Sequence, residues 1–190
     1  MARISKAPEV RRQELLNTAM ELFARQGYEE TSMSDIARAA GVAQGLCYRY
    51  FDSKQKLFQE AMAQYVRNCC DIYLPVIHDR GKTIRMRLVE IAGLISESDR
   101  HSQYSAFYHR ADSRALHEEL SLSIARFLLP HVTEELCAAC DNGELQVRCP
   151  EVAASYLLYG LIGLLGEGER PLSQRLEEAL RYAALILHAG

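Results

Sequence analysis

The sequence predicts an all-α protein with a small N-terminal helical head and a larger C-terminal helical body. Apolar residues recur about every 3.6 positions along almost every segment, and no segment sustains the period-two alternation of a β-strand. Glycine, proline, serine, threonine and aspartate stand at the ends of these segments, where helices start and stop. Hydrophobic residues make up 48% of the 190 residues, which is ample for a packed core.

The first two helices of the head are predicted from apolar spacing and capping residues. Residues 9–26 carry their apolar side chains along one side. Residues 33–40 form a short helix that Ser32 can cap, with Asp35 in the position of a capping-box partner. Gly41 then suits the left-handed conformation that commonly ends a helix.

A third short helix is expected at residues 43–50, followed by a longer one. Either Asp52 or Ser53 can cap the longer helix, which runs to about Ile72. Pro75 is expected to close that run, because proline cannot continue a helix.

The body is predicted to hold the remaining helices. They are expected at residues 83–97, 102–111, 113–140, 151–166 and 173–188. Thr83 caps the first of them, Pro130 should kink the third, and residues 141–143 form a turn.

The short helices at 33–40 and 43–50 have the geometry of a helix-turn-helix, because only residues 40–42 join them. Small apolar residues such as Ala37 and Cys47 let them cross closely. The outward residues of the second helix are then Gln44, Gly45, Leu46, Tyr48, Arg49 and Tyr50. Glutamine can bind adenine, arginine guanine or phosphate, and leucine a thymine methyl group. An ordinary helical hairpin with exposed aromatics is the alternative.

Residues 21–58, ELFARQGYEETSMSDIARAAGVAQGLCYRYFDSKQKLF, strongly resemble the DNA-binding head of the TetR family of bacterial regulators. The matching features are Gly27-Tyr28, Thr31-Ser32, Ile36-Ala37, Ala40-Gly41-Val42, Gly45, Tyr48-x-Tyr50-Phe51, Lys54 and Leu57-Phe58. The motif covers roughly the first third of the chain. Beyond it, only the length and the all-helical plan match the family.

This resemblance implies a DNA-binding domain at residues 1–54, with its motif at about 32–51, and a ligand-binding and dimerisation domain at residues 55–190. It makes residues 43–50 the recognition helix. The implied DNA-binding residues are Met33 and Ser34 before it, Gln44, Leu46 and Arg49 facing bases, Gly45 at close approach, and Tyr48, Tyr50 and Lys54 on phosphates.

Three residues depart from the family pattern. Ala43 stands where a serine cap is common, which should cost the recognition helix roughly 1 kcal/mol. Cys47 replaces a leucine, and Tyr50 replaces a histidine. These departures affect individual contacts rather than the motif.

Charge and motifs argue against several other classes of protein. The formal net charge is −3, but residues 1–54 hold eight Lys/Arg against seven Asp/Glu, a net +1. On charge alone, an ordinary solvated N-terminal tail is the better explanation. No Ser/His/Asp or Cys/His arrangement has positional support, so we expect no enzyme and no cofactor.

The sequence gives no sign of a membrane location. No apolar core follows the N-terminal charges, so no signal peptide is expected. The longest apolar run, residues 152–166, is too short to span a bilayer. We therefore expect a cytoplasmic protein with no membrane partner and mostly reduced cysteines.

The cysteines at 137, 140 and 149 leave two interpretations open. The Cys137-x-x-Cys140 spacing suits a zinc half-site or a redox pair. No second pair has clean spacing, because Cys69 and Cys70 are adjacent. Inert helix-filling thiols are the simpler interpretation, and no metal site is predicted.

Two further sets of residues were assigned with the help of the resemblance. The expected ligand pocket holds Tyr65, Cys69, Tyr73, His101, Tyr104, Phe107, Tyr108 and His117. The expected dimer interface holds Leu157, Gly160, Leu161, Gly163, Leu164, Leu176, Leu180 and Leu187. Packing within one chain is the alternative for both sets.

The function implied is that of a transcriptional regulator, a ligand-responsive homodimeric repressor that binds a pseudo-palindromic operator. Its partners would be double-stranded DNA, a second copy of the chain and an unknown small molecule. A helical protein that handles a small molecule or a thiol, with a head that binds a protein, is the competing class.

Overall fold

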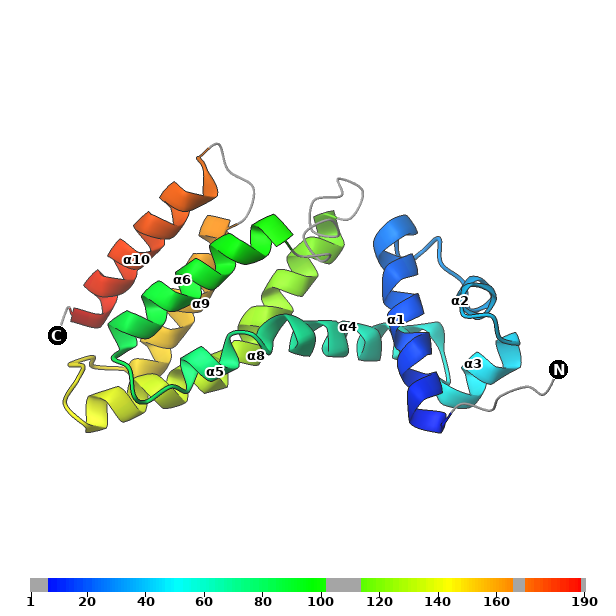
Figure 1. Ribbon diagram of the computed structural model, residues 1–190, viewed down its shortest axis with the longest axis horizontal. Helices are drawn as coiled ribbons and strands as arrows, with labels where there is room; N and C mark the ends of the chain where they lie inside the picture. Colours follow the sequence, from blue (N-terminus) through cyan, green and yellow to red (C-terminus); the bar gives the residue numbers. More distant parts are fainter. Residues whose placement is uncertain (1–6, 102–113, 166–169, 189–190) are drawn as a thin grey trace. The chain divides into compact units, whose positions relative to one another are not determined.

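The computed structural model describes residues 7–101, 114–165 and 170–188. Over these residues every regular element is an α-helix, so the all-α prediction is confirmed (Figure 1). The helices are α1 (Pro8–Gln26), α2 (Met33–Ala39), α3 (Gln44–Tyr50), α4 (Lys54–Cys70), α5 (Leu74–Ile77), α6 (Ile84–His101), α8 (Arg114–Asp141), α9 (Pro150–Leu165) and α10 (Leu172–His188). The helix expected at residues 102–111 lies outside the described residues.

The described residues fall into two compact units, which we call the head and the body. The head comprises residues 7–66 with 114–118, and the body comprises residues 67–101, 119–165 and 170–188. The division therefore lies inside α4, after Val66, whereas the sequence suggested a boundary after Lys54.

Apolar residues from α1 and α4 form the centre of the head. Leu15, Ala19 and Phe23 line one side of α1 at helical spacing and are fully buried. The ring of Phe58 on α4 meets that of Phe23 edge to face, with 5.1 Å between their centroids. Such aromatic pairs add specific geometry to the apolar burial that holds the two helices together.

A capping box starts α2, and a glycine sets the turn between α2 and α3. Ser32 Oγ accepts a hydrogen bond from Asp35 N at 3.1 Å, and Asp35 Oδ2 accepts one from Ser32 N at 3.0 Å. Gly41 has a φ of 64°, which a side-chain-bearing residue rarely adopts. The chain then reverses at once, because Val42 N donates to Ala37 O at 2.9 Å.

Ser53, rather than Asp52, caps α4, since Ser53 Oγ accepts from Lys56 N at 3.1 Å. The expected role of Pro75 was wrong. α4 already ends at Cys70, and Pro75 lies in the first turn of α5. Proline fits there because the first backbone N–H groups of a helix need no partner within the helix.

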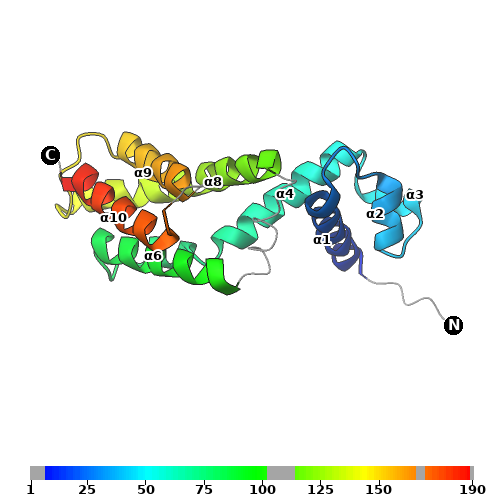
Figure 2. The same ribbon diagram turned by 90° about the horizontal axis from the view of Figure 1, so that it is seen from above.

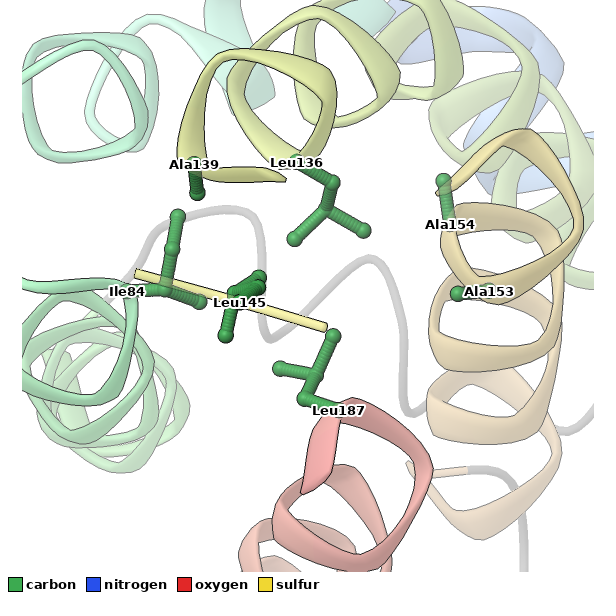
Figure 3. Close-up of a cluster of buried hydrophobic side chains, with 7 residues drawn as sticks. All are labelled: Ile84, Leu136, Ala139, Leu145, Ala153, Ala154 and Leu187. Atoms are coloured by element: carbon green, nitrogen blue, oxygen red, sulfur yellow. The ribbon is translucent and has the colours of Figure 1, made fainter. Parts of the chain in front are cut away.

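The core of the body is one cluster of buried apolar residues, contributed by four helices and one loop. It consists of Ile84 from α6, Leu136 and Ala139 from α8, Leu145 from the 142–149 loop, Ala153 and Ala154 from α9, and Leu187 from α10 (Figure 3). α10 packs beside both α9 and α6 (Figure 1, Figure 2). α8 continues through Pro130.

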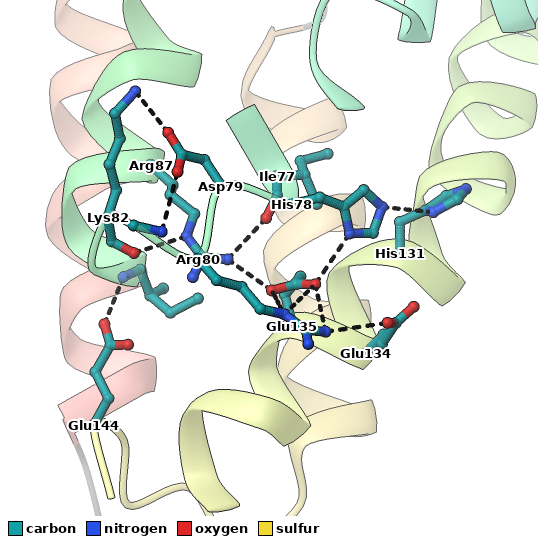
Figure 4. A network of polar contacts seen from close by, with 12 residues as sticks. Ile77, His78, Asp79, Arg80, Lys82, Arg87, His131, Glu134, Glu135 and Glu144 are labelled. Atoms are coloured by element: carbon teal, nitrogen blue, oxygen red, sulfur yellow. Dashed lines mark hydrogen bonds and ion pairs between the residues drawn. The ribbon is translucent and has the colours of Figure 1, made fainter. Parts of the chain in front are cut away.

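A polar network joins the α5–α6 turn to α8 (Figure 4). Glu135 is buried at its centre and accepts hydrogen bonds from Arg80, Arg87 and His78 at 2.9–3.2 Å. His78 Nε2 lies 3.0 Å from His131 Nδ1 on α8. Burial opposes ionisation of this carboxyl group, but the hydrogen bonds from Arg80, His78 and Arg87 outweigh it and lower the pKa of Glu135 to about 2.

The first turn of α6 is held by two side chains. Thr83 Oγ1 accepts from Met86 N at 3.2 Å, as the sequence suggested. Glu144, from the loop after α8, accepts from Ile84 N at 2.5 Å (Figure 4). One donor at the start of α6 is therefore satisfied by a residue 60 positions away.

Candidate nucleic-acid interface

α3 is anchored in the head by one apolar side. Cys47 in its middle is 0% exposed, and Phe51 directly after it is 1% exposed. α3 packs against α2, whose Ile36 and Ala37 are also buried. Anchoring one side of a seven-residue helix fixes which side faces the solvent.

The solvent-facing side of α3 carries most of the residues predicted to bind DNA. Gln44, Gly45 and Arg49 are exposed, and Tyr48 is 48% exposed. Leu46 and Tyr50 are half-buried. Within the described chain Arg49 has no ion-pair partner, so its guanidinium is available to an anion.

The start of α2 contributes less than expected. Ser34 is exposed, as a DNA contact requires. Met33 is 4% exposed and belongs to the head core, which argues against its predicted contact with DNA. The reason is spacing, because Met33 lies three and four residues before buried Ile36 and Ala37 on the same side of the helix.

Lys54 is engaged inside the head. Its Nζ donates to Tyr28 O at 2.9 Å and lies 4.1 Å from the centroid of the Tyr28 ring. The ammonium group thus ties the start of α4 to the turn between α1 and α2. A phosphate contact by Lys54 stays a prediction. In the structure without DNA, its ammonium group already contacts Tyr28.

Two arginines of the head were not singled out in the sequence. Arg12 forms an ion pair with Glu60, and its guanidinium lies 5.1 Å from the centroid of the Phe51 ring. Arg38 on α2 is exposed and pairs with Asp35. Arg12 and Glu60 are 48 residues apart, so no local pattern could have indicated their contact.

Comparison with known proteins identifies the family. Residues 15–61 match the family model described as bacterial regulatory proteins, tetR family. The relative named "Probable acrEF/envCD operon repressor", from Escherichia coli (strain K12), is 30% identical over 151 residues, which cover 75% of this chain and 68% of the relative. The chain belongs to the TetR family. It is therefore a DNA-binding transcriptional regulator with a helix-turn-helix head.

Other comparisons extend the TetR-family likeness to nearly the whole chain. The regulator SrpR of Pseudomonas putida is 29% identical over 181 residues, covering 92% of this chain and 83% of SrpR. The solved structure of Salmonella enterica GusR has a TM-score of 0.69 at 18% identity and covers 97% of this chain and 99% of that one. The GusR likeness supports the fold alone.

The predicted pocket of this TetR-family regulator is only partly described. Tyr65 is buried, and Cys69 and Tyr73 are half-buried. The other predicted pocket side chains lie outside the described part, namely His101, Tyr104, Phe107, Tyr108 and His117. Among described residues, no group of three or more His, Cys, Asp or Glu side chains is arranged to hold a metal ion.

The predicted dimer residues divide into two groups. Gly160 and Gly163 are exposed, and Leu157, Leu161, Leu164 and Leu180 are half-buried. Leu176 and Leu187 are 5% and 3% exposed, which argues against their predicted place in the interface. Leu187 is part of the core of its own body. No described helix is long and apolar enough to cross a membrane.

Proposed function

We propose that this TetR-family regulator is a homodimeric repressor that releases its operator when it binds a small molecule. The observation that carries the proposal is α3, which exposes Gln44, Tyr48 and Arg49 over a fully buried Cys47. The Escherichia coli relative is named as an operon repressor, which supports repression as the outcome of DNA binding.

The exposed side chains suit the major groove of DNA. Gln44 can form two hydrogen bonds to adenine, and Arg49 can bind guanine or a phosphate. Gly45 has no atom within 4 Å of where a Cβ would stand, so the backbone there is open to close approach. Tyr48 offers a hydroxyl group to a phosphate oxygen.

An exposed apolar face on α9 supports the homodimer. Val152, Tyr156 and Tyr159 repeat at helical spacing along it and are all exposed. Gly160 and Gly163 continue the same face, and among the described residues no atom outside the local backbone of α9 lies within 4 Å of where their Cβ atoms would stand. A second copy of the chain could approach this smooth surface closely.

The neighbouring helix also carries exposed apolar residues. Tyr182 and Leu185 on α10 are more than half exposed. Two copies joined there would form an isologous pair, and two recognition helices could enter successive major grooves about 34–36 Å apart. A pseudo-palindromic operator follows from that symmetry.

α4 supports a response to a ligand. It is one continuous helix from Lys54 to Cys70, so a displacement near its end is carried along its length. Tyr65, Cys69 and Tyr73 offer aromatic and apolar contacts, which favours an apolar or aromatic compound. Such a ligand can release DNA only if it binds the non-DNA geometry more tightly.

The ligand response can be tested by reciprocity. Operator DNA must weaken binding of the ligand by the same factor as the ligand weakens binding of DNA. A compound found by thermal-shift screening is titrated with and without operator. Equal affinities would show that this compound is not the inducer.

The proposed readout can be tested after a genomic pull-down has supplied the operator. Gln44→Ala and Arg49→Ala should each cost about 1–3 kcal/mol of operator affinity and relax base preference. Arg67→Ala is the matched control, since Arg67 is exposed near the other end of α4. Fluorescence anisotropy measures the operator affinity of all three variants. Unchanged affinity in both α3 variants would refute this docking.

A further inference from the structure

Two histidines from distant parts of the sequence face each other in the body. His78 directly follows α5, and His131 lies in the middle of α8. His78 Nε2 is 3.0 Å from His131 Nδ1, and the two rings meet edge to face (Figure 4). Both residues belong to the body, so their contact does not depend on how the head is placed.

The carboxylate of Glu135 determines which nitrogen of His78 carries a proton. His78 Nδ1 lies 3.0 Å from Glu135 Oε1, while Nε2 faces His131. An ionised carboxylate can only accept hydrogen bonds, so Nδ1 is the donor. The lone pair of a neutral His78 ring is then on Nε2. Histidines that bind a metal ion commonly donate their second ring N–H to a carboxylate in this way.

The two rings are held in place but can be reached from the solvent. The side chain of His78 is 36% exposed, and His131 is half-buried. The ring of Phe127, one turn earlier on α8, lies against that of His131 with 5.6 Å between their centroids. A hydrated ion could therefore approach the facing nitrogens without a rearrangement of the core.

The charged side chains beside the pair balance one another. Glu135 pairs with Arg80 and Arg87, and Glu134 also pairs with Arg80. Two carboxylates and two guanidinium groups have no net charge together. A dication at the histidines therefore meets no net repulsion from these four side chains.

We propose that His78 Nε2 and His131 Nδ1 bind one transition-metal dication, with Zn²⁺ as the first candidate. Imidazole nitrogens suit Zn²⁺, as well as Cu²⁺ and Ni²⁺. Two nitrogens on one tetrahedral zinc ion stand roughly 3.3–3.4 Å apart, given Zn–N bonds of about 2.0–2.1 Å. The observed separation is 3.0 Å, so a small rotation of the rings is enough to admit the ion.

Binding replaces the hydrogen bond between the rings. His131 takes the tautomer that carries its proton on Nε2, which frees the lone pair of Nδ1. Water completes the coordination, because among the described residues no third His, Cys, Asp or Glu completes the set. The ion then links the end of α5 to α8. No local pattern in the sequence indicates this site, since its two histidines are 53 residues apart.

The test titrates Zn²⁺ into the chelator-treated full chain and follows binding by isothermal titration calorimetry. His78→Ala and His131→Ala should each bind one ion fewer than wild type. His188→Ala is the matched histidine control, because residue 188 ends α10 rather than lying on α8. Cys149→Ser controls for the exposed thiol. Both controls should bind as many ions as wild type.

A second measurement covers any loss of stability caused by the substitutions themselves. An ion that binds only the folded chain stabilises it, so Zn²⁺ should raise the urea midpoint of wild type. Each variant is compared with itself, with and without Zn²⁺. The midpoint should rise less in His78→Ala and His131→Ala than in wild type. Nitrogen NMR of the histidine rings should show Zn²⁺-dependent shifts at His78 Nε2 and His131 Nδ1.

Three results would overturn the proposal. The first is a wild-type chain that binds no Zn²⁺. The second is an unchanged number of bound ions in either His78→Ala or His131→Ala. The third is loss of the ion in Cys149→Ser, which would assign it to a thiol. None of these measurements uses DNA or an inducer, so their outcome is independent of the proposed function.

Discussion

Glu135 shows how one residue can hold an element junction together. It is buried on α8 and receives hydrogen bonds from Arg80 and Arg87, which flank the start of α6. Arg87 is itself buried and also donates to Ile77 O at 2.8 Å. Removing the carboxylate would leave a buried cation without its counter-charge, which costs far more than losing an exposed pair.

The first prediction is that Glu135 makes the stability of the body depend on pH in the acidic range. Its folded-state pKa of about 2 is below its ordinary 4.5, so its stabilisation is complete above pH 4.5 and is lost as the pH falls toward 2. Glu135→Gln should lower the free energy of unfolding at neutral pH by about 2–3 kcal/mol. The difference in free energy of unfolding between Glu135→Gln and wild type should become smaller as the pH falls from 4.5 toward 2.

Urea unfolding at several pH values measures this difference. Glu134→Gln is the control, because Glu134 is exposed and forms an exposed ion pair with Arg80 at 3.2 Å. An exposed ion pair contributes about 0–1 kcal/mol. A constant gap between wild type and Glu135→Gln at every pH would contradict the assignment.

The second prediction separates two roles of Lys54. If its contacts with Tyr28 hold the head together, Lys54→Ala should lower the melting temperature of the head. It should also lower the free energy of unfolding by about 1–2 kcal/mol. A residue that only binds phosphate would instead leave the melting temperature unchanged and reduce the salt slope of DNA binding by about one unit.

Lys56→Ala is the control for this experiment. Lys56 is exposed on the same helix and pairs with Glu60 at 3.7 Å, one turn away. Thermal unfolding and salt-dependent binding are measured on both variants. Equal melting temperatures for Lys54→Ala and wild type would remove the structural role.

At the scale of elements, α2 and α3 are capped unequally. α2 has a complete capping box, whereas Ala43 at the start of α3 has an extended backbone but no side-chain hydrogen bond. The first backbone N–H groups of α3 therefore have no side-chain cap and depend on solvent or on a ligand.

The third prediction is that Ala43→Ser stabilises α3. Its hydroxyl group can accept from a backbone N–H of the first turn, which should raise the free energy of unfolding of the head by about 1 kcal/mol. Ala39→Ser is the control, because Ala39 ends α2 and offers no N-terminal donor to accept from. Urea unfolding compares them, and equal effects would refute the capping argument.

Helix positions could be predicted from sequence because their signals are local. The Ser32 cap, Gly41 and the apolar spacing of residues 9–26 each act within a few residues, and the structure has them as expected. Pro75 was misplaced because proline both ends helices and suits their first turn. Only the surrounding backbone decides between those two uses.

The site was predictable to a similar depth. The outward side of α3 follows from one buried residue, Cys47. Lys54 and Tyr28 are 26 residues apart, so no local sequence pattern could predict their contact. The burial of Met33 could have been predicted from its spacing to Ile36 and Ala37, which place it on the buried side of α2. The burial of Leu187 in the body core could not be predicted, because an apolar stripe does not say which neighbour buries it.

At the scale of the whole molecule, the apolar face of α9 is the feature that a single chain leaves unused. Tyr156 is 69% exposed at its centre. Contiguous exposed apolar surface of this kind commonly marks an interface. DNA binding by the proposed dimer would then depend on residues of the body as much as on α3.

The fourth prediction is that Tyr156→Glu produces a monomer. A carboxylate introduced there would be buried without a partner in an apolar interface, which is strongly unfavourable. Operator affinity should fall, while the head stays folded. Val89→Glu is the control, because Val89 is 56% exposed on α6 and is also changed from apolar to charged. Sedimentation that shows Tyr156→Glu as a dimer would exclude this face.

The bond from Ile84 N to Glu144 has a consequence for amide hydrogen exchange. The first amides of a helix usually exchange quickly, because no carbonyl of their own helix protects them. The Ile84 amide is covered by a side chain of the 142–149 loop, so it should exchange only when that loop detaches. The exchange rate of this amide would therefore report how often the 142–149 loop opens, separately from fraying of the start of α6.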